Sequence, residues 1–273
     1  MKRILILTIV GAAVLYLGCC LALYVEQRSF EYFPVPRSLA ATEMAGTFRS
    51  GDTLLQLTVR PHAGPGAVLY FGGNGEDVSS SIGPMIAAFP DREIVMLHYR
   101  GYGGSAGTPT EADIAADAAG LFDKVYAEHS DVIVIGRSLG TGVAARLAST
   151  RPVSRLVLVT PYDSLVGLAQ REFPIFPVRW ILIDKYESWR YVPEIAAPVL
   201  ILRAEHDQVI PAESTAALLA RFPADQACEV LVPGAGHNSI AEYPIYVRAL
   251  SGFAQGSCSS PESRAGPGEN GSI

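Results

Sequence analysis

A serine flanked by glycines lies where an apolar stretch ends and a helix-like stretch begins. Ser138 is the centre of the triplet Gly136-x-Ser138-x-Gly140 in the run VIVIGRSLGTGVAARLA. A sharp turn of this kind strains the serine backbone, so the residues two before and two after it must lack side-chain bulk. Because the turn also points the first N–H groups of the helix at an anion, we interpret Ser138 as a nucleophile rather than an incidental serine.

A serine hydroxyl needs a base to take its proton, and a histidine oriented by a carboxylate supplies one. Asp207 follows the strand-like run PVLILR, and His237 follows the run EVLVP. The chain order Ser138, Asp207, His237 is that of an α/β-hydrolase. Asp163, in TPYDSL after the preceding strand, is the alternative acid.

The other histidines are weaker candidates for the base. His98 lies at a strand end and is expected to be structural, while His62 and His129 are expected at the surface. His206 adjoins the proposed acid. His237 is therefore the predicted base.

A tetrahedral oxyanion needs two N–H donors. Leu139, immediately after the nucleophile, is expected to supply one of them. The second is expected from the loop after AVLYF, which reads GGNGE and whose glycines let the backbone approach a substrate closely. Asn74 is the candidate donor in this loop, and Gly75 is the alternative.

The elements that must hold these residues alternate along the chain. Apolar strand-like runs are expected at 54–59, 67–71, 93–99, 132–136, 155–160, 198–203 and 229–232. Helices are expected at 110–128, with Thr110 as N-cap, and at 139–149 and 212–221. This pattern predicts an α/β fold with a mostly parallel sheet covered on both faces. Active sites in such sheets lie beyond the carboxyl ends of the strands.

Residues 4–25 form an uncharged apolar run, long enough to cross about 30 Å of hydrocarbon. Lys2 and Arg3 precede it, so the positive-inside rule places the N-terminus in the cytoplasm and the domain on the outer, periplasmic or lumenal side. We expect a single-pass anchor at 1–26 and a juxtamembrane linker at 27–44. A cleaved or lipidated leader is the alternative.

The chain of 273 residues suits one large domain, expected at 45–254, besides the anchor and linker. The aromatic and proline-rich segment 161–197 interrupts the alternation and is expected to be a small cap that lines the substrate site in part. From Ser251 onward the chain is rich in Gly, Ser and Pro and has too little apolar content to order itself, which predicts disorder and a disordered tail at 255–273. The net charge of −6, without a long basic run, argues against nucleic acid as a partner.

The four cysteines show no disulfide framework and no metal-ligand spacing. They are Cys19, Cys20, Cys228 and Cys258.

Together these motifs resemble the Bem46-like branch of the α/β-hydrolase superfamily, which includes membrane-anchored hydrolases. The resemblance covers roughly residues 30–250, and its motifs occur in order. They are YFGGNGE, YRGYGGSAGTPTEADIAADAAGLF, GRSLGTGVAA, TPYDSL, APVLILRAEHDQVIP and PGAGHN.

The resemblance implies the fold of an α/β-hydrolase, a catalytic triad of Ser138, Asp207 and His237, and oxyanion donors at Asn74 and Leu139. An N-terminal membrane segment is common in this branch. The chain departs from it in two places. Gly72 stands where the oxyanion loop often has a histidine, and His98 stands where an aspartate is frequent, so both changes are expected to alter the substrate pocket.

The prediction is a membrane-anchored serine hydrolase that cleaves carboxylic ester or thioester bonds through an acyl-enzyme. No metal or organic cofactor is expected. The expected substrate is a small-molecule or lipid-like acyl ester or thioester, presented at the bilayer surface. A serine peptidase or amidase on the same fold, or a non-catalytic α/β-hydrolase scaffold, is the alternative.

Overall fold

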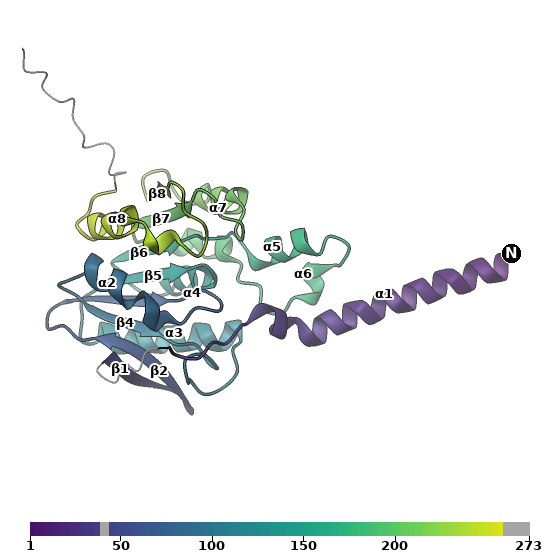
Figure 1. The fold of residues 1–273 in the computed structure, drawn as a ribbon, viewed down its shortest axis with the longest axis horizontal. Helices are drawn as coiled ribbons and strands as arrows, with labels where there is room; N and C mark the ends of the chain where they lie inside the picture. Colours follow the sequence, from purple (N-terminus) through teal and green to yellow (C-terminus); the bar gives the residue numbers. More distant parts are fainter. Residues whose placement is uncertain (39–43, 259–273) are drawn as a thin grey trace, which may run out of the picture.

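The strands of the chain form one sheet, in the order β1-β2-β4-β3-β5-β6-β7-β8 (Figure 1). The computed structural model describes residues 1–38 and 44–258. β2 runs antiparallel to its neighbours β1 and β4, and the other pairs are parallel. The strands are β1 (Ala45–Ser50), β2 (Thr53–Arg60), β3 (Gly66–Phe71), β4 (Glu93–Leu97), β5 (Asp131–Arg137), β6 (Arg155–Val159), β7 (Val199–Ala204) and β8 (Ala227–Val232).

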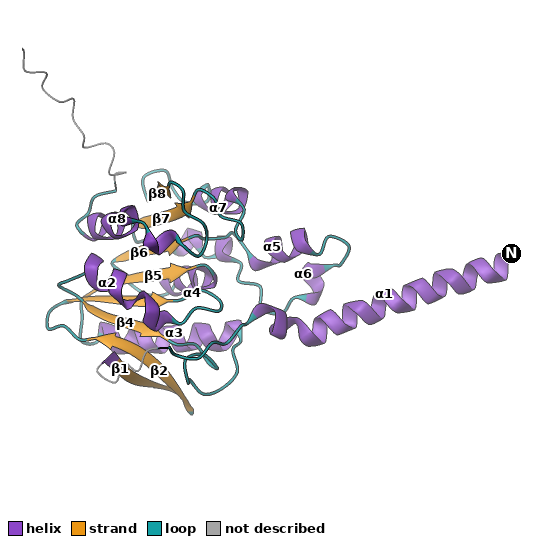
Figure 2. Ribbon diagram, viewed as in Figure 1, coloured by secondary structure: helices purple, strands orange, loops and turns teal. Residues whose placement is uncertain are grey.

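Helices cover both faces of this sheet (Figure 2). The long helix α1 leaves the domain beside α5 and α6, which lie between β6 and β7. The helices are α1 (Lys2–Glu31), α2 (Ile82–Ala88), α3 (Glu111–Tyr126), α4 (Leu139–Ala148), α5 (Leu165–Glu172), α6 (Val178–Ile181), α7 (Ala212–Leu219) and α8 (Pro244–Ala254).

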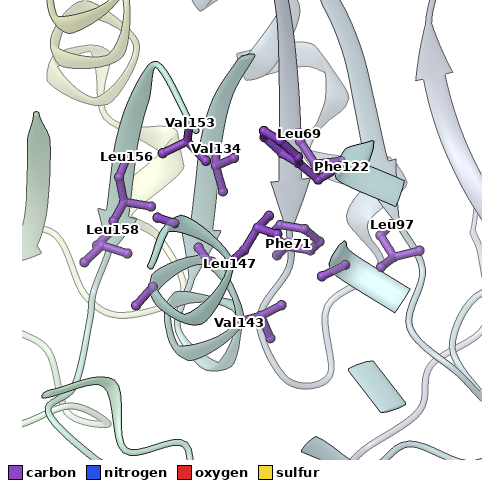
Figure 3. Close-up of a cluster of buried hydrophobic side chains, with 14 of the residues drawn as sticks. Leu69, Phe71, Leu97, Phe122, Val134, Val143, Leu147, Val153, Leu156 and Leu158 are labelled. Atoms are coloured by element: carbon purple, nitrogen blue, oxygen red, sulfur yellow. The ribbon is translucent and has the colours of Figure 1, made fainter. Parts of the chain in front are cut away.

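The alternation of side chains along β3 separates two cores. Leu69 and Phe71 point to the face covered by α3 and α4, and Figure 3 shows them packed there with residues of those helices. Val68 and Tyr70 point to the opposite face, which is covered by α2 and α8. Every residue of β3 is buried, which agrees with its apolar sequence and is expected for a central parallel strand.

The seven strands expected from the sequence are all present, as are the three expected helices. The hydroxyl of Thr110 accepts a hydrogen bond from the Asp113 N–H, which confirms it as the N-cap of α3. The sequence did not predict β1. It is an edge strand that pairs only with β2 and buries none of its residues fully, so its apolar signal is weak.

Two expectations for the end of the chain need correction. Residues 251–254 are not disordered, because α8 continues to Ala254 and buries Leu250 and Phe253 against the sheet. Cys228 of β8 forms a disulfide with Cys258, although the sequence indicated no such framework. The pairing arises because the chain returns past β8 after α8, a proximity that spacing alone does not reveal. The expected disordered tail from 259 onward lies outside the described residues.

α1 extends beyond the expected anchor, since it ends at Glu31. Its last turns pack on the domain and bury Gln27 and Glu31. Within the described residues one helix, Lys2–Glu31, is long and apolar enough to cross a membrane.

Candidate active site

Ser138 lies in a strained turn between β5 and α4. Its φ is 49° and its ψ is −117°, a conformation that L-residues rarely adopt. A Cβ at Gly136 would come within 2.3 Å of the carbonyl oxygen of Gly140, and a Cβ at Gly140 would come within 2.1 Å of the carbonyl oxygen of Phe71. Both glycines are therefore required by close backbone packing around the serine.

The structure brings the three predicted triad residues together. The Nε2 atom of His237 lies 2.9 Å from the Oγ atom of Ser138, and its Nδ1 atom lies 2.9 Å from Oδ2 of Asp207. A carboxylate can only accept, so Nδ1 carries a proton and donates to Asp207, while Nε2 is free to accept from the serine hydroxyl. This geometry can pass the serine proton to the imidazole.

Asp207 is held in place by its own loop. Its Oδ1 atom accepts hydrogen bonds from the N–H groups of Val209 and Ile210, at 2.9 and 2.7 Å. Burial raises the pKa of Asp207, but the hydrogen bonds from His237 and from Ile210 outweigh it and lower the pKa below its ordinary value. The carboxylate is thus ionised at neutral pH and can stabilise an imidazolium.

The alternative acid, Asp163, has other partners. Its Oδ1 atom accepts a hydrogen bond of 2.7 Å from the hydroxyl of Ser214 in α7. Nδ1 of His237 is already engaged by Asp207. The geometry therefore favours Asp207 as the orienting acid.

The loop after β3, in which the sequence predicts an oxyanion donor, lies against the serine. The N–H of Gly73 donates to Glu76 at 2.6 Å, so it is not free for a substrate. The Asn74 side chain is also committed, since its Nδ2 donates to the Glu31 carbonyl and its Oδ1 accepts from the Phe33 N–H. The backbone N–H of Asn74 is the group that remains available in this residue.

Leu139 is the first residue of α4, and Asn74, Ser138 and Leu139 line one cavity. The first N–H groups of a helix have no partner within the helix. The Leu139 N–H is therefore available to a substrate oxygen beside Ser138. The catalytic and oxyanion roles of these residues stay predictions.

A buried ion pair that the sequence did not indicate links the parts of the site. Oε2 of Glu76 lies 3.2 Å from Nη1 of Arg137, the residue before the nucleophile. Nη2 of Arg137 in turn donates to the carbonyls of His237 and Asn238, at 3.4 and 3.3 Å. The only signals were the glutamate in GGNGE and the arginine in GRSLG, and neither letter indicates its partner.

The cavity at Ser138 has a volume of about 260 Å³ and is mostly apolar. Its walls come from the cap, as expected for 161–197, and also from the end of α1, which the sequence did not indicate. The lining residues are Leu23, Gln27, Phe30, Glu31, Asn74, Ser138, Leu139, Tyr162, Leu165, Leu168, Ala169, Phe173, Phe176, Val178, Ile181, Leu182, Val209 and Ile210.

Two of the other histidines are buried. His98 donates to or accepts from the Thr58 hydroxyl at 2.9 Å, and burial lowers its pKa to about 4, in line with a structural role. The expectation that His129 lies at the surface is wrong. It is buried at the end of α3, where its Nδ1 atom lies 2.8 Å from the Gly64 carbonyl oxygen.

The chain is similar to several known proteins along much of its length. It is 32% identical to the uncharacterized protein Rv2307c of Mycobacterium tuberculosis, over 87% of this chain and 90% of that protein. It is 31% identical to the alpha/beta hydrolase domain-containing protein aho-3 of Caenorhabditis elegans, over 57% of this chain and 46% of that protein. Lysophosphatidylserine lipase ABHD12 of Macaca fascicularis is 34% identical over 43% of this chain and 35% of its own length.

The fold is also found among solved structures. The esterase Pf2001 of Pyrococcus furiosus superposes with a TM-score of 0.67 at 17% identity, covering 84% of this chain and 99% of that one. No protein-family model matches the chain.

The sheet order and these relatives define an α/β-hydrolase fold, as the sequence predicted. The chain belongs to the α/β-hydrolase superfamily. Its named relatives include a lysophosphatidylserine lipase, in agreement with the resemblance seen in the motifs, although the chain spans only about a third of that protein's length.

Proposed function

We propose that the protein is a membrane-anchored serine hydrolase of carboxylic ester or thioester bonds. The observation that carries this proposal is the continuous contact from Ser138 through His237 to Asp207, with 2.9 Å at each step. The strained backbone of Ser138 adds support, because strained backbone conformations are concentrated at active sites, where the surrounding structure holds them.

The reaction proceeds in two halves. Oγ of Ser138 attacks the acyl carbonyl carbon while Nε2 of His237 takes the hydroxyl proton. The N–H groups of Asn74 and Leu139 stabilise the oxyanion, and the imidazolium then gives its proton to the departing alkoxide or thiolate. Water attacks the acyl-serine with His237 again as base, which releases a carboxylic acid and restores the serine.

The apolar cavity beside Ser138 supports an acyl chain as the group held there. The names of two similar proteins, a lysophosphatidylserine lipase and an esterase, agree with ester chemistry. Activity on an ester is measured with short-chain p-nitrophenyl esters. We expect turnover by the wild type and a loss of at least about 10³-fold in Ser138→Ala. Equal turnover by the variant would contradict the proposal.

α1 supports retention of the N-terminal segment as an anchor. Leu23 lines the cavity, so cleavage at the end of the apolar run would remove part of the cavity wall. Lys2 and Arg3 before the apolar run support a domain on the outer side of the membrane. Protease treatment of sealed vesicles with a known orientation tests this. Digestion of the domain from the outer face is expected, and full protection would contradict the orientation.

A further inference from the structure

The cap is fixed to the end of α1 by polar contacts. Oε1 of Gln27 accepts from the Ile183 N–H at 2.7 Å, and its Nε2 donates to the Ile181 carbonyl at 3.2 Å. At the next residue along the chain, the Arg28 guanidinium donates to the buried carboxylate of Asp184 at 3.0 Å. These contacts hold α6 and the residues after it beside the last turns of α1.

A second set of contacts lies much farther along α1. The hydroxyl of Tyr16 donates to the Ile175 carbonyl at 2.9 Å, and its ring stacks on Phe176 with centroids 5.8 Å apart. Tyr16 precedes Gln27 by eleven residues, which is about 16 Å along a helix axis. The loop before α6 therefore extends along α1 toward the middle of the apolar run.

This arrangement has a consequence if α1 crosses the bilayer. The run 4–25 has the length of the hydrocarbon layer with little to spare, so Tyr16 lies well inside that layer. Ile175 and Phe176, which contact Tyr16, must then lie below the membrane surface too. Figure 1 shows α5 and α6 on the side of the domain from which α1 projects.

The exposed side chains of the cap fit that location. Trp180 is 86% exposed and Ile175 is 72% exposed, and Phe173 and Ile183 are exposed as well. Four large apolar side chains exposed within eleven residues are unusual on a surface that meets water alone, and tryptophan favours the membrane interface.

Two arginines of the cap are compatible with a location in the membrane. Arg171 turns toward α7, where its guanidinium lies 3.6 Å from the carboxylate of Glu213. Arg179 adjoins Trp180 at the level of Gln27, where a long arginine side chain can reach lipid headgroups.

We propose that the cap is embedded with α1 in the leaflet next to the domain, and that the cavity at Ser138 takes the acyl chain of a membrane lipid directly from that leaflet. The cavity is lined by Leu23 and Phe30 of α1, by Leu168 and Phe176 of the cap, and by Ser138. An acyl chain that enters along these apolar side chains would reach Ser138 without crossing water. The inference rests on the anchored hydrolase proposed above, and its tests separate the two.

The two tryptophans of the chain provide a matched pair of depth probes. Trp180 lies on the exposed cap, whereas Trp189 packs on the core with the guanidinium groups of Arg190 and Arg221 each 5.2 Å from its ring. Full-length Trp189→Phe and Trp180→Phe are reconstituted in vesicles that contain phospholipids brominated either near the headgroup or near the chain end. A third variant adds Ile175→Trp to both substitutions.

Quenching is expected for Trp180 with bromine near the headgroup, and for the tryptophan at position 175 with the deeper bromine. Trp189 should keep its fluorescence in both lipids. If the protein floats with the vesicles and Trp180 is quenched no more than Trp189, the embedded cap is overturned and the anchor stands. Labelling of each variant by a fluorophosphonate reports the triad separately, so loss of that labelling would concern the proposed chemistry instead.

Ile175→Asp tests lipid access. It should lower turnover of a long-chain ester held in vesicles about tenfold, because a carboxylate is costly within the hydrocarbon layer. Turnover of a soluble short-chain ester should stay unchanged. Leu54→Asp, on an exposed position of β2 away from the cap, is the control and should change neither rate. Equal rates for wild type and Ile175→Asp on the vesicle-held ester would overturn the access route.

Discussion

The carboxylate of Glu76 lies 3.2 Å from the guanidinium of Arg137, with both side chains largely buried. Glu76 also accepts the Gly73 N–H in the loop after β3, and Arg137 donates to the backbone of the His237 loop. One ion pair therefore connects the loop after β3, the turn at Ser138 and the loop of His237, which come from three distant parts of the sequence.

Glu76→Gln should weaken both catalysis and stability. The substitution leaves Arg137 buried without its charge partner, which costs about 3–5 kcal/mol in comparable sites. We expect a lower free energy of unfolding in urea and a fall in kcat for a short-chain ester, with KM little changed. Asp123→Asn is the control, because it breaks the more exposed pair with Arg151 and should cost no more than about 1 kcal/mol. Similar losses in the two variants would contradict the linking role of Glu76.

Gly140→Ala should abolish activity and destabilise the domain, because the new Cβ would lie 2.1 Å from the Phe71 carbonyl oxygen. Gly83→Ala provides the matched control. A Cβ there meets no atom within 4 Å among the described residues, and alanine favours a helix by about 1 kcal/mol over glycine. Thermal unfolding of the two variants should therefore shift in opposite directions, and a soluble, active Gly140→Ala would refute the packing argument.

Asp207→Asn should reduce turnover by about 10⁴-fold while leaving the fold intact, since an amide no longer fixes the required tautomer of His237. Asp163→Asn should keep most of the activity, because the carboxylate of Asp163 contacts Ser214 instead. Steady-state kinetics of the two variants on one ester decide whether Asp207 or Asp163 orients His237. The reverse order of effects would reassign the orienting acid.

His98 predicts a pH dependence of stability. Burial lowers its pKa to about 4, whereas an exposed histidine titrates near about 6.5. Between these values the unfolded chain takes up a proton that the folded chain does not, so the free energy of unfolding falls as the pH drops, by up to about 3 kcal/mol in total. His98→Gln should flatten this part of the profile in urea unfolding at pH 7, 6, 5 and 4. An unchanged slope would show that His98 is not its source.

The triad could be predicted from sequence because each member follows a strand, and parallel strands deliver their carboxyl ends to one edge of the sheet. The ion pair between Glu76 and Arg137 could not, since a single charged letter does not indicate its partner. The sequence also did not show that α1 forms part of the cavity. An apolar run has the same composition whether lipid or protein contacts it, and only the contacts of Tyr16 and Gln27 with the cap distinguish the two.

The central proposal is that Ser138 forms a covalent intermediate. Its most direct measurement is mass spectrometry of peptides from the wild-type protein after reaction with a fluorophosphonate. We predict one adduct, on the peptide that contains Ser138, and its absence when His237→Ala is treated for the same time. A stoichiometric adduct on any other serine, with the Ser138 peptide unmodified, would contradict the account.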